Sequence, residues 1–115
     1  MASGTVKRGT VLLWTNSSPS SSFSAQTIPL DLTDFDAVKV FVCQDTTHTG
    51  SGVMVEAPRG YDGRALVMYN ARQYREFSWS DTGVSFNAGM NGAVGGNLSQ
   101  SNTCAIPLKI YGIRY

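Results

Sequence analysis

With 115 residues and a formal net charge of +1, the chain has room for one domain with a buried core and carries no strong electrostatic field. The near balance of 9 Lys and Arg against 8 Asp and Glu argues against duplex nucleic acid or an anionic membrane as the main partner. Charged residues are few, at 15%, and 12 glycines accompany many Ser and Thr, as in all-β domains with many turns. No apolar run resembles a signal peptide or a membrane span, so we expect a product made in the cytoplasm, with no membrane insertion.

Short runs with strand-like alternation follow one another along the chain, separated by clusters of turn residues. The clearest run is 37–44, where three valines alternate with other partly apolar side chains, so we expect this strand in the middle of a sheet. The last run contains Ile106 and Ile110 in phase and must pair with an earlier strand to satisfy its backbone groups. The expected strands cover residues 9–15, 26–30, 37–44, 53–57, 64–70, 72–80, 82–88 and 103–115.

About eight strands at spacings of ~8–12 residues predict an all-β fold. We expect a single-domain antiparallel β-sandwich or jelly roll over residues 9–115, preceded by an N-terminal arm of residues 1–8.

Three local features of this pattern make specific predictions. Residues 45–52 are rich in Thr and Gly and predict a loop. Asn91-Gly92 favours the tip of a type I′ hairpin. The alternation of the last strand changes phase at Gly112, which predicts a bulge or bend there. Whether the runs on either side of Ala71 form a hairpin or one bent strand is left open by the sequence.

Residue types that catalyse reactions or bind metals are sparse. The single histidine, His48, has no spaced partner and is expected in an exposed loop. Three aspartates within 31–36 suit turns and caps better than a calcium loop, and the Gly-rich stretch 89–96 lacks the lysine of a phosphate cradle. Glu56 and Asp62 flank a turn, and a glycosidase would need Glu56 or Asp62 in a cleft. We therefore expect no enzyme, no metal and no cofactor.

The two cysteines, Cys43 and Cys104, both lie inside apolar strand patterns. Two cysteines without a secretion signal do not make a disulfide framework. We expect buried free thiols, with a bridge as the alternative.

Arginine and aromatic residues gather between residues 59 and 79. They suit recognition of a partner or a sugar, because rings pack against apolar faces while the guanidinium donates in a fixed fork. The simpler alternative places Phe77 and Trp79 in the core and the arginines on a solvated sheet face. The candidate residues for binding a ligand or partner are Arg59, Tyr61, Asp62, Arg64, Arg72 and Tyr74.

Four stretches of sequence together resemble a known family. They are Gly-Thr-Val-Leu-Leu-Trp-Thr-Asn at 9–16, Ile-Pro-Leu at 28–30, Phe-Asp-Ala-Val-Lys-Val at 35–40 and the closing Lys-Ile-Tyr-Gly-Ile-Arg-Tyr at 109–115. Over residues 9–115 the chain resembles the small β-domains of tail-fibre and other virion structural proteins of bacteriophages and prophages.

This resemblance implies a non-enzymatic virion protein, usually a homotrimer when it sits on a fibre, exposed outside a particle that assembles in the host cytoplasm. Its expected partners are other virion proteins and a host-surface glycan. A fibre protein is normally longer and has a shaft, so the options are a receptor-binding tip, or a standalone capsid-decoration or head-fibre subunit. No functional residue carries over, because such domains vary their binding loops. The alternative hypothesis is a carbohydrate-binding module of a secreted bacterial protein.

Overall fold

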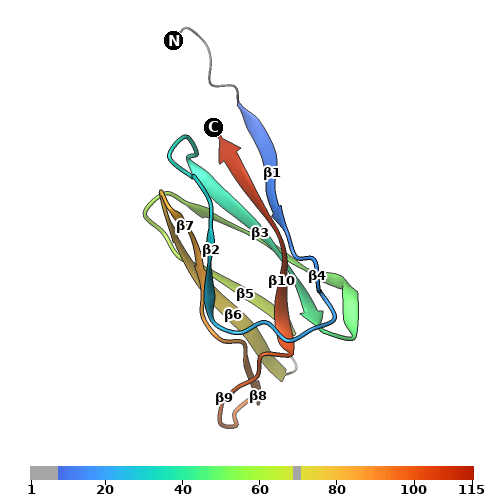
Figure 1. Ribbon diagram of the computed structural model, residues 1–115. Coiled ribbons are helices and arrows are strands. Elements are labelled where there is room, and N and C mark those ends of the chain that lie inside the picture. The colour runs from blue at the N-terminus through green and yellow to red at the C-terminus, as the bar shows by residue number, and fades with distance from the viewer. Residues whose placement is uncertain (1–7, 69–70) are drawn as a thin grey trace, which may run out of the picture.

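The computed structural model describes residues 8–68 and 71–115, which form two antiparallel sheets and no helix (Figure 1). The antiparallel β-sandwich expected from the strand pattern is confirmed. The first sheet has the order β1 (Gly9–Thr15), β10 (Cys104–Arg114), β3 (Ala37–Asp45) and β4 (His48–Pro58). The second sheet has the order β2 (Gln26–Pro29), β7 (Gly83–Phe86), β6 (Ala71–Ser80), β8 (Met90–Ala93) and β9 (Ser99–Gln100), with β5 (Gly63–Met68) paired to β6. Of the expected N-terminal arm, residues 1–7 lie outside the described residues.

Strand β3 lies in the middle of the first sheet, as its apolar pattern predicts. It pairs with β10 on one side and β4 on the other. Val40 is fully buried and stands opposite Ile110 of β10 and Val55 of β4, so one apolar row crosses three strands. The last strand, β10, lies between β1 and β3 and pairs with both (Figure 1).

The predicted bulge in β10 exists, but not at Gly112. The pairing of β10 with β3 shifts between Pro107 and Lys109, so Leu108 is the extra residue. Proline has no N–H to donate to a ladder, which explains why the irregularity follows Pro107. Gly112 pairs regularly, and its role is to make room: a Cβ there would lie 2.6 Å from the ring of Phe35.

The prediction of a loop over residues 45–52 is wrong, because this stretch forms a tight hairpin. Strand β3 runs to Asp45 and β4 begins at His48. The Asp45 carboxylate accepts hydrogen bonds from the backbone N–H and hydroxyl of Thr47, both at 2.9 Å, and lies 2.8 Å from Nδ1 of His48. His48 is exposed, as expected. Thr46 and Thr47 form the turn, whereas Thr49, Gly50 and Gly52 belong to the first half of β4.

Asn91-Gly92 does not form a hairpin tip. Both residues lie in β8, where they pair with Gln73 and Arg72 of β6. The stretch does contain a hairpin, because β8 pairs with β9, but its connection lies at residues 94–98. Cross-strand partners on β6 therefore outweigh the local turn preference of the dipeptide.

The open question about the runs on either side of Ala71 is settled by the pairing of β5 with β6. The two strands are antiparallel neighbours, with Arg64 opposite Glu76 and Leu66 opposite Tyr74. Residues 69–70, the expected end of the first run, lie outside the described residues.

Arg75 of β6 is completely buried between the sheets. Its guanidinium donates from Nε to the carbonyl of Ala105 at 2.6 Å, from Nη1 to Asn87 at 2.7 Å and from Nη2 to Cys104 at 3.3 Å. Its central carbon lies 5.2 Å from the ring of Phe23. Burial lowers the pKa of Arg75 to about 10, so the side chain stays charged at neutral pH. The alternative that places the arginines of residues 59–79 on a solvated sheet face is therefore wrong for Arg75.

The two cysteines are buried free thiols, as expected. Burial raises the pKa of both the Cys43 and the Cys104 thiol.

Candidate binding face

The outward face of the second sheet is built by the alternation of β6. Arg75 and Phe77 point into the core, so Tyr74 and Glu76 point away from it. Arg64 of β5, opposite Glu76, donates to its Oε2 from Nη2 at 2.6 Å and from Nε at 3.0 Å. The guanidinium carbon of Arg64 also lies 5.0 Å from the centre of the Tyr74 ring. One arginine thus holds both an aromatic and an acidic side chain in place, and the hydrogen bonds to Glu76 raise the pKa of Arg64.

Two adjoining hollows lie on this face, and we call them together the β6 groove. The first has a volume of about 410 Å³ and is lined by Ala25, Tyr74, Glu76, Asn87, Ala88, Met90 and Gln100. The second has a volume of about 290 Å³ and is lined by Asp62, Glu76, Phe77, Ser78 and Asn87. Glu76 and Asn87 line both hollows, so the two lie side by side.

The groove lies beside β6, at the gap between the two strands, β7 and β8, that pair with successive parts of it. Strand β7 ends at Phe86 and β8 begins at Met90, so the link between them leaves the ladder. Two backbone hydrogen bonds fix this link: Asn87 donates to the carbonyl of Glu76 at 2.9 Å, and Ser101 donates to that of Gly89 at 2.7 Å. The side chain of Asn87 is exposed and remains available at the centre of the groove.

Three of the six residues singled out from the sequence meet at the groove. Asp62 lines the smaller hollow, Tyr74 lines the larger one, and Arg64 contacts Tyr74 and Glu76. Arg72 lies on the same strand, but its Nη2 donates to the carbonyls of Ala93 and Gly96 and so holds the β8–β9 hairpin.

Arg59 and Tyr61 lie outside the groove. Arg59 pairs with Asp81 at 2.6 Å, packs over the ring of Trp79 at 4.7 Å and donates to the carbonyls of Leu32 and Phe35. Through these hydrogen bonds Arg59 holds the loop between β2 and β3 in place. Tyr61 is 68% exposed in the turn between β4 and β5.

Several groove residues, among them Glu76, Asn87, Met90 and Gln100, were not singled out from the sequence. Glu76 had a detectable signal, since it lies two positions beyond Tyr74 and therefore on the same face of a strand. Asn87, Met90 and Gln100 had none, because the break between β7 and β8 brings them to the groove.

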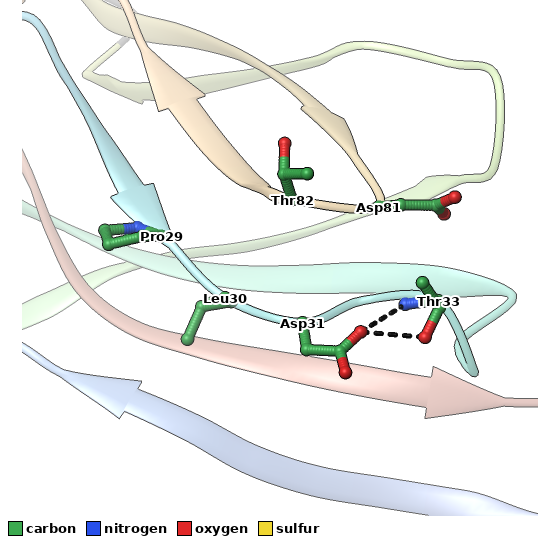
Figure 2. A pocket seen from close by; sticks show the side chains of 6 residues that line it. All are labelled: Pro29, Leu30, Asp31, Thr33, Asp81 and Thr82. Atoms are coloured by element: carbon green, nitrogen blue, oxygen red, sulfur yellow. Dashed lines mark hydrogen bonds between the residues drawn. The ribbon is translucent and has the colours of Figure 1, made fainter.

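A third hollow, of about 470 Å³, lies elsewhere, between the end of β2 and the turn after β6 (Figure 2). Its carboxylates already have partners: Asp31 accepts from the hydroxyl of Thr33 at 2.7 Å and from its backbone N–H at 3.2 Å, and Asp81 pairs with Arg59. These hydrogen bonds lower the pKa of Asp31, which has the turn role expected for it. No aromatic side chain lines this hollow, so it is the weaker candidate.

The two acids weighed as a glycosidase pair are not brought together. Glu56 accepts a hydrogen bond from the Tyr115 hydroxyl at 2.8 Å beside the first sheet, whereas Asp62 lines the groove on the second. Within residues 8–68 and 71–115, no group of three or more His, Cys, Asp or Glu side chains is arranged to hold a metal ion.

Comparison of the chain with protein-family models, curated proteins and solved structures finds no match. Among the residues that the structure describes there is also no helix of the length and apolarity needed to cross a membrane. On its fold and site, the chain is an all-β sandwich whose second sheet carries an open groove of polar and aromatic side chains.

Proposed function

We propose that the chain is a non-enzymatic structural protein of a bacteriophage virion that acts by binding, either to the host surface or to other virion subunits. The observation that carries the binding role is the β6 groove, an open surface in which Tyr74, Glu76 and Asn87 converge. Concave sites with a few convergent polar groups and an aromatic ring are the common form of binding sites. The virion assignment is supported by the resemblance of residues 9–115 to small phage β-domains.

The proposed assembly is a homotrimer formed through the outward face of the first sheet. Leu12 and Met54, 49% and 51% exposed, lie on this face together with the partly exposed Phe41 and Tyr111. Apolar side chains exposed on one face commonly mark a contact between proteins. Sedimentation equilibrium at micromolar concentration tests this assembly: we expect a trimer for the wild type and a monomer for Met54→Lys, whereas a monomeric wild type contradicts it.

Binding is tested by adding labelled purified chain to host cells and, separately, to purified particles. We expect saturable binding to one of them that is weakened by Tyr74→Ala. Tyr61→Ala is the matched control, since it removes an exposed tyrosine outside the groove. Saturable binding to neither target, or release of reducing sugar from cell-wall material as evidence of hydrolysis, contradicts a non-enzymatic binding protein.

A carbohydrate-binding module of a secreted bacterial protein is the second candidate, because the same groove suits it. Trp79, one of the aromatic residues that such a module could use, does not line the groove: its indole N–H donates to the carbonyl of Ala57 at 3.1 Å. The two candidates differ in location, with the first found on particles and the second free in the culture medium.

A further inference from the structure

We propose that the β6 groove binds a neutral, linear saccharide, held by hydrogen bonds with Glu76, Asn87 and Gln100 and by packing of a sugar ring against Tyr74. This inference rests on the binding function proposed above and adds the chemical class of the ligand. It follows from the groups that line the groove, from its charge and from its shape.

The polar groups of the groove match sugar hydroxyls, each of which donates one hydrogen bond and accepts others. The side-chain amides of Asn87 and Gln100 offer both donors and acceptors. Neither amide forms a hydrogen bond within the described part of the chain, and both line the larger hollow. Glu76 accepts the two hydrogen bonds of Arg64 through Oε2 alone, which leaves Oε1 to accept a hydrogen bond from a sugar hydroxyl.

The apolar part of the groove matches the C–H faces of a sugar ring. Tyr74 and Met90, which stand opposite each other on β6 and β8, line the larger hollow with Ala25 and Ala88. Arg64 lies 5.0 Å from the Tyr74 ring and does not itself line the hollow, so it orients the ring while leaving it in contact with the groove. An aromatic ring fixed in this way presents an apolar surface at a low cost in conformational entropy.

The charge of the groove suits a neutral saccharide. Arg64 and Glu76 form an ion pair and compensate each other. Asp62, in the smaller hollow, has no ion-pair partner among the residues that the structure describes. Arg75, whose Nη1 donates to the carbonyl of Asn87, adds one buried positive charge beneath the groove and offsets Asp62. The groove is therefore neutral overall, and an anionic ligand gains no net attraction there.

The shape of the groove favours a chain of sugars over a single ring. The hollows of about 410 and 290 Å³ share Glu76 and Asn87 as lining residues and so lie side by side along β6. Each hollow is near the lower end of the usual size range for small-ligand pockets. A linear saccharide can occupy both hollows, with one linkage passing Asn87.

The test is titration of ¹⁵N-labelled protein with neutral hexasaccharides of glucose, mannose, galactose and N-acetylglucosamine, and with oligogalacturonate as the anionic probe. We expect at least one neutral probe to shift the side-chain amide signals of Asn87 and Gln100, and the anionic probe to leave them unchanged. Tyr74→Ala should weaken the binding at least about tenfold. Asn87→Ala should also weaken it, and this variant keeps the backbone hydrogen bonds that hold the link. Tyr61→Ala should bind as the wild type does.

Three results would overturn the inference: no binding of any neutral probe, preferential binding of oligogalacturonate, or neutral binding that Tyr74→Ala and Asn87→Ala leave intact. Binding to host cells that survives periodate oxidation of their glycans would point to a protein partner and would also overturn it. Failure of the virion assignment has a different signature, since saccharide binding would persist while the chain was absent from particles.

Discussion

Arg75 on β6 donates a 2.6 Å hydrogen bond to the carbonyl of Ala105 on β10, and so ties the second sheet to the first inside the core. Ala105 has a φ of 51°, a left-handed conformation that is costly for alanine. Tyr74 and Glu76 flank Arg75 in the sequence and point the opposite way. The buried guanidinium therefore also fixes the strand that carries the groove.

The first prediction concerns this anchor. Arg75→Met would leave the carbonyls of Ala105, Asn87 and Cys104 without their donors in the core. We expect the free energy of unfolding to fall by about 3 kcal/mol, within the range for uncompensated buried polar groups. Urea denaturation followed by tryptophan fluorescence measures this change. A loss below about 1 kcal/mol would mean that the carbonyls find other partners.

The second prediction concerns the contact between Gly112 and Phe35. Gly112→Ala places a Cβ 2.6 Å from the Phe35 ring, so the ring or the strand must shift. Such overpacking should cost about 1–3 kcal/mol of stability. The matched control is Gly50→Ala, where a Cβ meets no atom within 4 Å and where we expect a change within about 0.5 kcal/mol. Equal effects of the two substitutions in chemical denaturation would contradict the packing role of Gly112.

The third prediction concerns pH. The hydroxyl of Tyr115 donates to Glu56 at 2.8 Å, and this bond raises the pKa of Tyr115 above its usual value of 10.0. Because the pKa is higher in the folded state, the bond stabilises the fold fully below pH 10.0 and its contribution is lost as the pH rises through the folded-state pKa.

An ultraviolet titration of tyrosinate, taken as the difference between the wild type and Tyr115→Phe, measures this pKa. Glu56→Ala should return it towards 10.0, because both the hydrogen-bond acceptor and its negative charge are removed. An unchanged titration curve in Glu56→Ala would show that the bond does not form in solution.

The fourth prediction concerns the thiols. Cys43 and Cys104 are buried, and burial raises the pKa of each thiol, so the reactive thiolate is scarce and inaccessible in the folded protein. Ellman's reagent should react slowly with the native protein and rapidly with both thiols in denaturant. A native protein that releases the full colour within the mixing time would contradict the burial of the two side chains.

Much of the fold could be predicted from alternation alone. Val40 sits in an uninterrupted period-two pattern, and its strand lies at the centre of the first sheet beside the strand that carries Ile110. The β3–β4 hairpin was missed because residues 48–52 are polar, and an exposed strand half resembles a loop in composition. The bulge was assigned to Gly112, although Pro107, which lacks a donor, was the better indicator.

The site could be predicted only in part, for a different reason. Tyr74 and Arg64 are recognisable by residue type, and the antiparallel pairing of β5 with β6 brings them together. Arg75 shares the inward phase of Phe77, but its burial depends on carbonyls that lie far away in the sequence. Asn87 reaches the groove through the break between β7 and β8, which depends on tertiary structure and has no local signal.

The central claim, that this is a binding protein of a phage virion, is tested most directly by quantitative mass spectrometry of gradient-purified particles. We predict that peptides of the chain co-purify with the other virion proteins at a fixed ratio, and that antibodies to the chain label intact particles. A chain found only in the particle-free medium or the cell lysate, and absent from purified particles, would contradict the claim.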